Sequence, residues 1–231
     1  MNLTLFSGGA AKAVATGLQA DFEQRHGCTL AATFGAVGTM RDNLLGGAPC
    51  DVVILSEALI RDLERQGHVV PGSARPLGRV ETGVAVRTGT PPIAVGDGEA
   101  LKATLAKAQG LYVPHLTQST AGQHIAGMLR KLGLEEALAG RIHEYPNGAV
   151  AMGELARSSG EDMIGCTQVT EILYTPGVTL VSELPQGYGL STVYTAACCT
   201  RAADPALAAR FVEALGGDES LALRKRAGFV I

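Results

Sequence analysis

The feature that most constrains this chain is the alternation, over residues 1–66, of short apolar runs with stretches of helical periodicity. Residues 3–6, 29–34 and 51–55 have the length and composition of strands. Between and after them, apolar residues recur every three or four positions in residues 10–26, 39–45 and 57–66. This β-α-β-α-β-α order predicts a parallel sheet with helices on both faces and right-handed crossovers.

A second series of the same kind follows a change of pattern. Residues 80–87 alternate as a strand does, and residues 88–98 are rich in proline and glycine and are expected to form a loop. Further strands are expected at residues 111–114, 143–145, 162–166 and 190–200. Further helices are expected at residues 99–108, 121–132, 149–156, 204–215 and 219–227.

These two series predict an α/β protein of two lobes, with the second lobe inserted in the first. Lobe I is expected to comprise residues 1–80 plus 195–231, and lobe II residues 81–194. Hinge strands are expected near residues 80–87 and 190–197, with a ligand cleft between the lobes. The length of 231 residues is enough for a core in each lobe.

Charge and composition exclude several classes of function. The net charge is −3 and aromatic residues make up 4% of the chain, so we expect no nucleic-acid partner. The one basic cluster, Arg224, Lys225 and Arg226, is interpreted as the solvated face of the last helix. No segment reaches the ~18 consecutive apolar residues of a membrane span, so no membrane insertion is expected.

The cysteines indicate core residues rather than metal ligands or disulfides. They are Cys28, Cys50, Cys166, Cys198 and Cys199, mostly within apolar runs, and no CxxC pair is present. No glycine fingerprint of a dinucleotide site occurs. We therefore expect no metal, no cofactor and a monomer.

The start of the chain leaves two locations open. No basic start or apolar stretch with a cleavage site precedes the strand expected at residues 3–6. The protein is cytoplasmic if Met1 is the native start, and periplasmic if a signal peptide has been removed.

Four expected strand ends have a common character. Each is small, lacks acidic side chains and leads into a helix, whose N-terminus carries free N–H groups and a partial positive charge. Such ends predict a site for a small anion at the carboxyl edge of the sheets. They are Ser7, Gly8, Gly9 and Ala10; Ala36, Val37, Gly38 and Thr39; Ser119, Thr120 and Ala121; and Asn147 and Gly148.

The chain resembles a known family in these segments. Residues 34–51, FGAVGTMRDNLLGGAPCD, and the C-terminal run FVEALGGDESLALRKRAGFVI are similar to the molybdate-binding proteins of ABC importers. The resemblance covers nearly the whole chain. It implies the type II periplasmic-binding-protein fold, hinge closure on a small anion, and the membrane subunits of an importer as partners if the protein is exported.

The chain departs from that family at the expected site. The family's ligand-binding serines fall on Ala10 and on Ala36, Val37 and Gly38, so their hydroxyl groups are absent and only backbone N–H groups remain. The family's tyrosine falls near Thr167. A small carboxylate, bound with the help of Ser7, Ser119, Thr120, Thr167 and Gln168, therefore fits as well as molybdate does.

An enzymatic alternative stays open beside the binding function. The sequence is also similar to aconitate isomerases, enzymes on the same fold that move a double bond by a 1,3 proton shift. Such a reaction needs a base near the carboxylate cradle. His115, just after an expected strand, and Glu171, in the run GCTQVTEIL, are the candidate bases.

Overall fold

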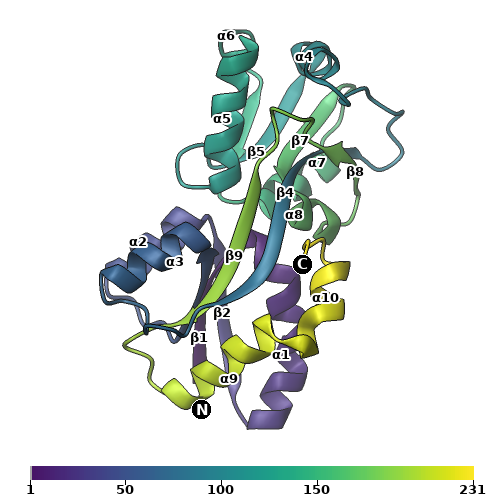
Figure 1. Cartoon of the computed structure of the whole chain (residues 1–231). Coiled ribbons are helices and arrows are strands. Elements are labelled where there is room, and N and C mark those ends of the chain that lie inside the picture. Colours follow the sequence, from purple (N-terminus) through teal and green to yellow (C-terminus); the bar gives the residue numbers. More distant parts are fainter. Residues whose placement is uncertain (1) are drawn as a thin grey trace. The chain divides into compact units, whose positions relative to one another are not determined.

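The computed structural model describes residues 2–231 and divides the chain into two compact units. The first unit contains the residues up to Val80 together with Thr192–Ile231, and the second contains Glu81–Ser191. The chain passes from one unit to the other within strand β4 (Arg75–Arg87) and again at the start of strand β9 (Ser191–Cys198) (Figure 1).

The first unit is built on a mixed sheet in the order β2-β1-β3-β9. β1 pairs in parallel with β2 and with β3, and β9 is antiparallel to β3. The strands of this sheet other than β9 are β1 (Asn2–Gly8), β2 (Thr29–Gly35) and β3 (Val52–Ser56). The helical segments are η1 (Gly9–Ala11), α1 (Lys12–His26), α2 (Val37–Leu45), α3 (Glu57–Arg65), α9 (Pro205–Gly216), η2 (Asp218–Ser220) and α10 (Leu221–Arg226).

Helices cover both faces of this first sheet. α2 and α3 lie on one side of the strands, and α1, α9 and α10 lie on the other (Figure 1). The second layer is held together by apolar contacts such as that between the rings of Phe22 and Phe211, whose centroids are 4.8 Å apart. Strand residues such as Leu3, Leu5 and Ile54 are fully buried, so the core lies between the sheet and its two helical layers.

The second unit repeats this architecture, with the same spatial arrangement of three parallel strands and one antiparallel strand. Its sheet runs β4-β7-β5-β6, and β8 pairs with β4. β5 is parallel to β6 and β7, and β4 is antiparallel to β7 and β8. The strands other than β4 are β5 (Gly110–Pro114), β6 (Ile142–Tyr145), β7 (Met163–Gln168) and β8 (Val178–Glu183). The helices are α4 (Gly98–Lys107), α5 (Thr120–Leu132), α6 (Glu135–Leu138), α7 (Gly148–Arg157) and α8 (Val169–Tyr174).

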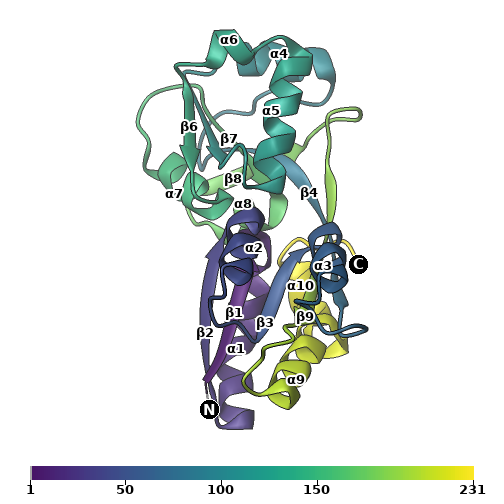
Figure 2. The same cartoon turned by 90° about the vertical axis from the view of Figure 1, so that its left-hand side faces the viewer.

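Helices α5 and α7 lie on opposite sides of the second sheet (Figure 2), and alternate residues of the central strand β5 belong to the two clusters on these sides. Leu111 and Val113 belong to the cluster that also contains residues of α4 and α5. Tyr112 belongs to the cluster that contains Met152 of α7 and Ile172 of α8. The prediction of an α/β fold with helices on both faces of the sheets is therefore confirmed.

Three features differ from the sequence-based expectation. β4 begins at residue 75 rather than 80, because Arg79 exchanges two backbone hydrogen bonds of 2.8 Å with Val230 of the distant C-terminus. α8 and β8 were not predicted as elements, because α8 is a six-residue helix and β8 is a half-buried strand with no clear alternation. α6, with four residues, is shorter than the patterns that indicate helices.

The interpretation of Arg224 as part of a solvated face is wrong. Its side chain is 5% exposed and donates hydrogen bonds to the Ser220 hydroxyl and to three backbone carbonyls, including that of Leu77. Burial lowers the pKa of Arg224 from its usual range, since desolvation disfavours the charged form. Lys225 and Arg226 are exposed, as predicted.

The cysteines are free and buried, in agreement with the prediction. Within residues 2–231 no group of His, Cys, Asp or Glu side chains is arranged to hold a metal ion. None of the described helices is both long and apolar enough to cross a membrane.

Candidate functional site

In the first unit, the two predicted loops lie next to each other at one edge of the sheet. β1 and β2 are in register along their whole length, with Ser7 opposite Phe34 and Gly8 opposite Gly35. Since both strands run in the same direction, the loops that follow them leave the sheet side by side. Ala10 and Ala36, at the positions of the lost hydroxyl groups, are both buried.

The N-terminus of α2 follows directly on the end of β2. Its N-cap is Ala36, and among the described residues no side chain caps the helix or places an acidic group in its first turn. The N–H groups of Val37, Gly38 and Thr39 have no acceptor within the helix, as is general for a first turn. Thr39 is exposed, and Val37 and Gly38 are buried.

The segment between β1 and α1 is closely packed. The Ser7 hydroxyl donates to the carbonyl of Gly8 at 2.9 Å, so its single hydrogen is already used. A side chain at Gly8 would come within 2.8 Å of Val37 and 3.0 Å of Tyr194. A glycine at this position therefore allows β1, β9 and the α2 N-terminus to approach one another.

Sequence reasoning missed one charged residue at this edge. The ammonium group of Lys12, the first residue of α1, lies 5.7 Å from the centroid of the Phe34 ring. Phe34 is the partner of Ser7 in the β1–β2 pair, so this ammonium group lies over the ring of a residue near the end of β2. Lys12 directly follows the small-residue run 7–11, and this position is the sequence signal by which it could have been found.

In the second unit, the parallel strands β5, β6 and β7 also end at one edge. α5 begins here with Ser119 as its N-cap, and the Ser119 hydroxyl oxygen accepts from the N–H of Gly122 at 3.3 Å. Ser119 is therefore a capping residue, while Thr120 and Ala121 form the first turn of α5. Gly122 passes so close to the carbonyl of His115 that no side chain fits.

The N-terminus of α7 is occupied by a carboxylate of the protein itself. Asn147 caps the helix by accepting from the N–H of Val150 at 2.9 Å. The carboxyl group of Glu171, on α8, accepts from the N–H of Gly148 at 3.1 Å and also from that of Ala149. Glu171 lies in the first turn of α8, and its carboxyl group reaches the N-terminus of α7.

Thr167 completes this buried group. Its hydroxyl donates to the second carboxyl oxygen of Glu171 at 2.6 Å, and both side chains are buried, at 0% and 5% exposure. Burial raises the pKa of Glu171, and the hydrogen bonds from Thr167 and from the backbone N–H groups of Gly148, Ala149 and Gln168 oppose that shift. Gln168, which ends β7, is 1% exposed.

The candidate base His115 lies just beyond the end of β5. Its Nδ1 is 3.3 Å from a carboxylate oxygen of Glu144 and 3.2 Å from the hydroxyl of Thr117. The side chain is 41% exposed, so solvent reaches the imidazole. His115 and Glu171 thus belong to the same unit but to different local hydrogen-bond groups.

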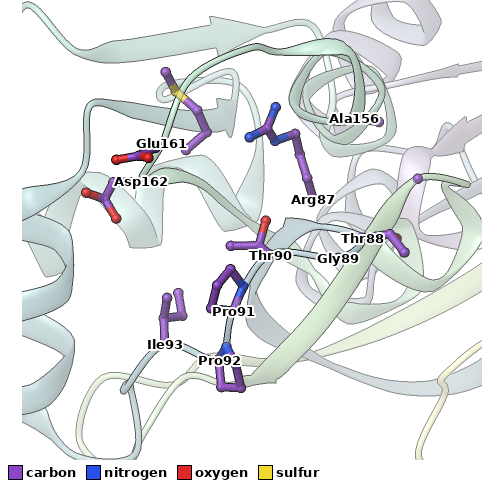
Figure 3. A pocket seen from close by; sticks show the side chains of 12 residues that line it. Arg87, Thr88, Gly89, Thr90, Pro91, Pro92, Ile93, Ala156, Glu161 and Asp162 are labelled. Carbon is purple, nitrogen blue, oxygen red and sulfur yellow. The ribbon is translucent and has the colours of Figure 1, made fainter.

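A large cavity of about 880 Å³ lies away from these loops (Figure 3). Arg87, Glu161 and Asp162 line it together with Pro91 and Pro92 of the loop after β4. Met163, the first residue of β7, also lines it, so the cavity opens at the amino end of a strand whose carboxyl end carries Thr167 and Gln168. None of the predicted site residues lines this cavity.

Comparison with protein families gives a match over nearly the whole chain. A family model described as bacterial extracellular solute-binding protein matches residues 3–230. Aconitate isomerase from a Pseudomonas species is 27% identical over 183 residues, which are 78% of this chain. The match spans 66% of the isomerase, slightly less than two thirds of its length.

Solved structures share the fold at low identity. The periplasmic molybdate-binding protein of Azotobacter vinelandii superposes with a TM-score of 0.81 at 20% identity, over 99% of both chains. The sulfate-binding protein SubI of Mycobacterium tuberculosis superposes with a TM-score of 0.74 at 20% identity, over 99% of this chain and 86% of its own. The predicted periplasmic-binding-protein fold is confirmed by these likenesses.

Proposed function

The chain belongs to the family of bacterial extracellular solute-binding proteins, and on that premise we propose that it binds one small anion. The observation that carries the proposal is the N-terminus of α2, which has no capping side chain within residues 2–231 and no acidic residue in its first turn. A helix N-terminus of this kind favours negative charge. The adjacent ammonium group of Lys12 adds a full positive charge to the same edge.

The composition of the loops bears on the kind of anion. In the first unit the donors are backbone N–H groups, because Ala10, Ala36, Val37 and Gly38 carry no hydroxyl group. Backbone donors at a helix N-terminus bind carboxylates as well as tetrahedral oxyanions. Two classes of ligand are therefore proposed: small di- or tricarboxylates, and oxyanions such as molybdate or sulfate.

The same proposal extends to the second unit and to transport. There we expect Thr120, Ala121, Thr167 and Gln168 to contact the ligand, with residues 80–87 and 190–197 as the hinge of a closing motion. Delivery of the bound anion to the membrane subunits of an ABC importer is the corresponding biological role. Small-angle X-ray scattering with and without ligand tests the closure, which is expected to lower the radius of gyration.

A thermal-shift screen tests the binding proposal. The purified chain is heated with molybdate, tungstate, sulfate, phosphate, and cis- and trans-aconitate in turn, with chloride at equal ionic strength as the control. A ligand that binds only the folded state raises the melting temperature. A shift with one class and none with the other identifies the class, and no shift with any anion contradicts the proposal.

An isomerase is the second candidate, favoured by the 27% identity to aconitate isomerase. Proton NMR of cis- and trans-aconitate incubated with the protein over hours detects movement of the double bond. If it moves, His115→Gln and Glu171→Gln distinguish the two candidate bases, since loss of turnover with retained binding marks the base. If both acids bind and neither changes, the protein binds aconitate without isomerising it.

A further inference from the structure

Glu171 acts as an internal anion at the N-terminus of α7. Its carboxyl group accepts from the N–H groups of Gly148 and Ala149, and the remaining N–H of that first turn, on Val150, donates to Asn147. The first turn of α7 therefore has its donors satisfied before any ligand arrives. A ligand in the second unit must use the other polar groups at this edge, of which Thr167 is the nearest to Glu171.

The hydroxyl of Thr167 has one hydrogen, and that hydrogen is committed. It is donated to Glu171 Oε2 at 2.6 Å in a buried environment. An ionised carboxylate only accepts hydrogen bonds, so it keeps the Thr167 hydrogen for itself. An anion that approaches Thr167 in this state meets oxygen lone pairs and the negative charge behind them.

Protonation of Glu171 reverses this arrangement. One proton from solvent converts the carboxylate to a carboxylic acid, which can donate its own O–H to the oxygen of Thr167. The Thr167 hydrogen is then free to turn toward an anion, and the negative charge is gone. The two buried side chains thus have one arrangement that repels an anion and one that accepts it.

Within residues 2–231, no charged group is among the causes of the shift in the Glu171 pKa. Burial is the main cause of its raised pKa, and only hydrogen-bond donors oppose that shift. The charged groups on the neighbouring elements have other partners or are exposed. Glu154 pairs with Arg157 on α7, Arg87 of β4 donates to backbone carbonyls, and Glu183 of β8 is exposed. Cys166, on β7, has a pKa raised by burial to about 12, so its thiol stays neutral.

We infer that anion binding at Thr167 is coupled to the uptake of one proton by Glu171, so that this pair makes ligand affinity depend on pH. The inference rests on the proposed anion-binding function and names a regulatory property of the same site. Above the pKa of the free protein's Glu171, affinity falls by up to tenfold for each unit of pH. A ligand that brings its own proton, such as a protonated oxyanion or a carboxylic acid, avoids this loss.

Isothermal titration calorimetry between about pH 5 and about pH 9 tests the coupling. Sulfate is the first probe because it does not titrate in this range, and trans-aconitate is the second. Titrations in buffers of different ionisation enthalpy count the protons taken up with the anion. The expected result is uptake that approaches one proton per bound anion at the high-pH end.

Four variants separate the coupling from other effects. Glu171→Gln mimics the protonated acid, so its affinity is expected to stay high at all pH values with no proton uptake. Thr167→Val removes the hydroxyl and is expected to lower affinity at low pH about tenfold, whereas Thr167→Ser restores it. Glu154→Gln removes a charge from the partly exposed surface of α7 and should keep the wild-type pH dependence.

The outcomes distinguish this inference from the function on which it rests. Binding with the same pH dependence in the wild type and in Glu171→Gln overturns the coupling and leaves the anion-binding function standing. Binding of neither probe at any pH contradicts both. A ligand-free check uses the carboxyl ¹³C signals of glutamate, among which one is expected to titrate well above the usual range and to disappear in Glu171→Gln.

Discussion

At the scale of single residues, Glu171 makes the stability of the fold depend on pH. Its pKa in the folded chain is raised, chiefly by burial, above its value in the unfolded chain. The stabilising contribution of the bound proton is therefore complete below the unfolded pKa of about 4.3 and is lost as pH rises through the folded pKa.

The substitution Glu171→Gln removes this dependence. Relative to the wild type, the variant is expected to gain free energy of unfolding as pH rises through the folded pKa, and to reach a plateau above it. Urea unfolding at about pH 5 and about pH 8 measures the difference. Parallel changes in the two proteins would show that Glu171 does not titrate in this way.

The buried contact between Glu171 and Thr167 requires a glycine at position 148. A methyl group at this position would collide with Glu171 Oε2 and with the Thr167 hydroxyl. Gly148→Ala is therefore expected to lower the free energy of unfolding by more than about 2 kcal/mol. Chemical denaturation measures the loss.

Gly153 provides the matched control on the same helix. The nearest atoms to an added methyl group there are 3.7 Å away, at the mobile end of Arg157. Gly153→Ala is expected to stabilise by up to about 1 kcal/mol, because alanine favours helix more than glycine does. Equal effects of the two substitutions would contradict the close packing inferred around Gly148.

At the scale of elements, Arg224 fastens the C-terminal helices of the first unit to β4. It donates to Leu77 at 2.7 Å and to the carbonyls of Gly216 and Gly217 at 3.0 and 2.8 Å. Arg224→Met leaves these buried acceptors without partners and is expected to cost about 3 kcal/mol of unfolding free energy. Lys225→Met, at an exposed position of the same helix, should change the free energy of unfolding by less than about 0.5 kcal/mol. Similar losses of unfolding free energy in the two variants would contradict the role of Arg224.

The N-terminus of α2 provides a second test at this scale. Thr39→Glu puts a negative charge in its first turn, where it should stabilise the helix by about 0.5 kcal/mol while repelling an anionic ligand. Affinity for the anion is expected to fall about tenfold by calorimetry. Asn43→Glu adds the same charge near the far end of the helix and should leave affinity nearly unchanged. An equal loss of affinity in both variants would show that the site does not lie at this terminus.

The elements that sequence reasoning predicted are those with a complete local pattern. β1, β2 and β3 are apolar runs bounded by turns, and α1 carries a regular apolar stripe. The first part of β4 and the whole of β8 depend on partners far along the chain, Val230 in one case and β4 in the other. Such pairing leaves little trace in the local sequence.

The candidate site was predictable in its location along the chain and less so in its chemistry. Small residues after β1 and β2 indicated loops beside a helix N-terminus. The positions of Lys12 beside Phe34 and of the Glu171 carboxyl group at the N-terminus of α7 depend on side-chain directions and tertiary packing. Nothing in the sequence around Glu171 indicates that its carboxyl group accepts hydrogen bonds from the N–H groups of α7, a different helix.

At the scale of the whole molecule, the chain carries one set of strand-to-helix loops in each of two compact units. Family membership over residues 3–230 covers both units, so the proposed binding function belongs to the chain as a whole. The large cavity of the second unit lies at the other end of its strands and has no part in the proposal.

Isothermal titration calorimetry of the purified chain with molybdate, sulfate and trans-aconitate, each against a chloride background, tests the central claim most directly. The account predicts saturable binding of at least one of these anions, with one anion per chain and loss of affinity in Thr39→Glu. The absence of heat from all of them at any pH, with the protein folded by its melting curve, would contradict it.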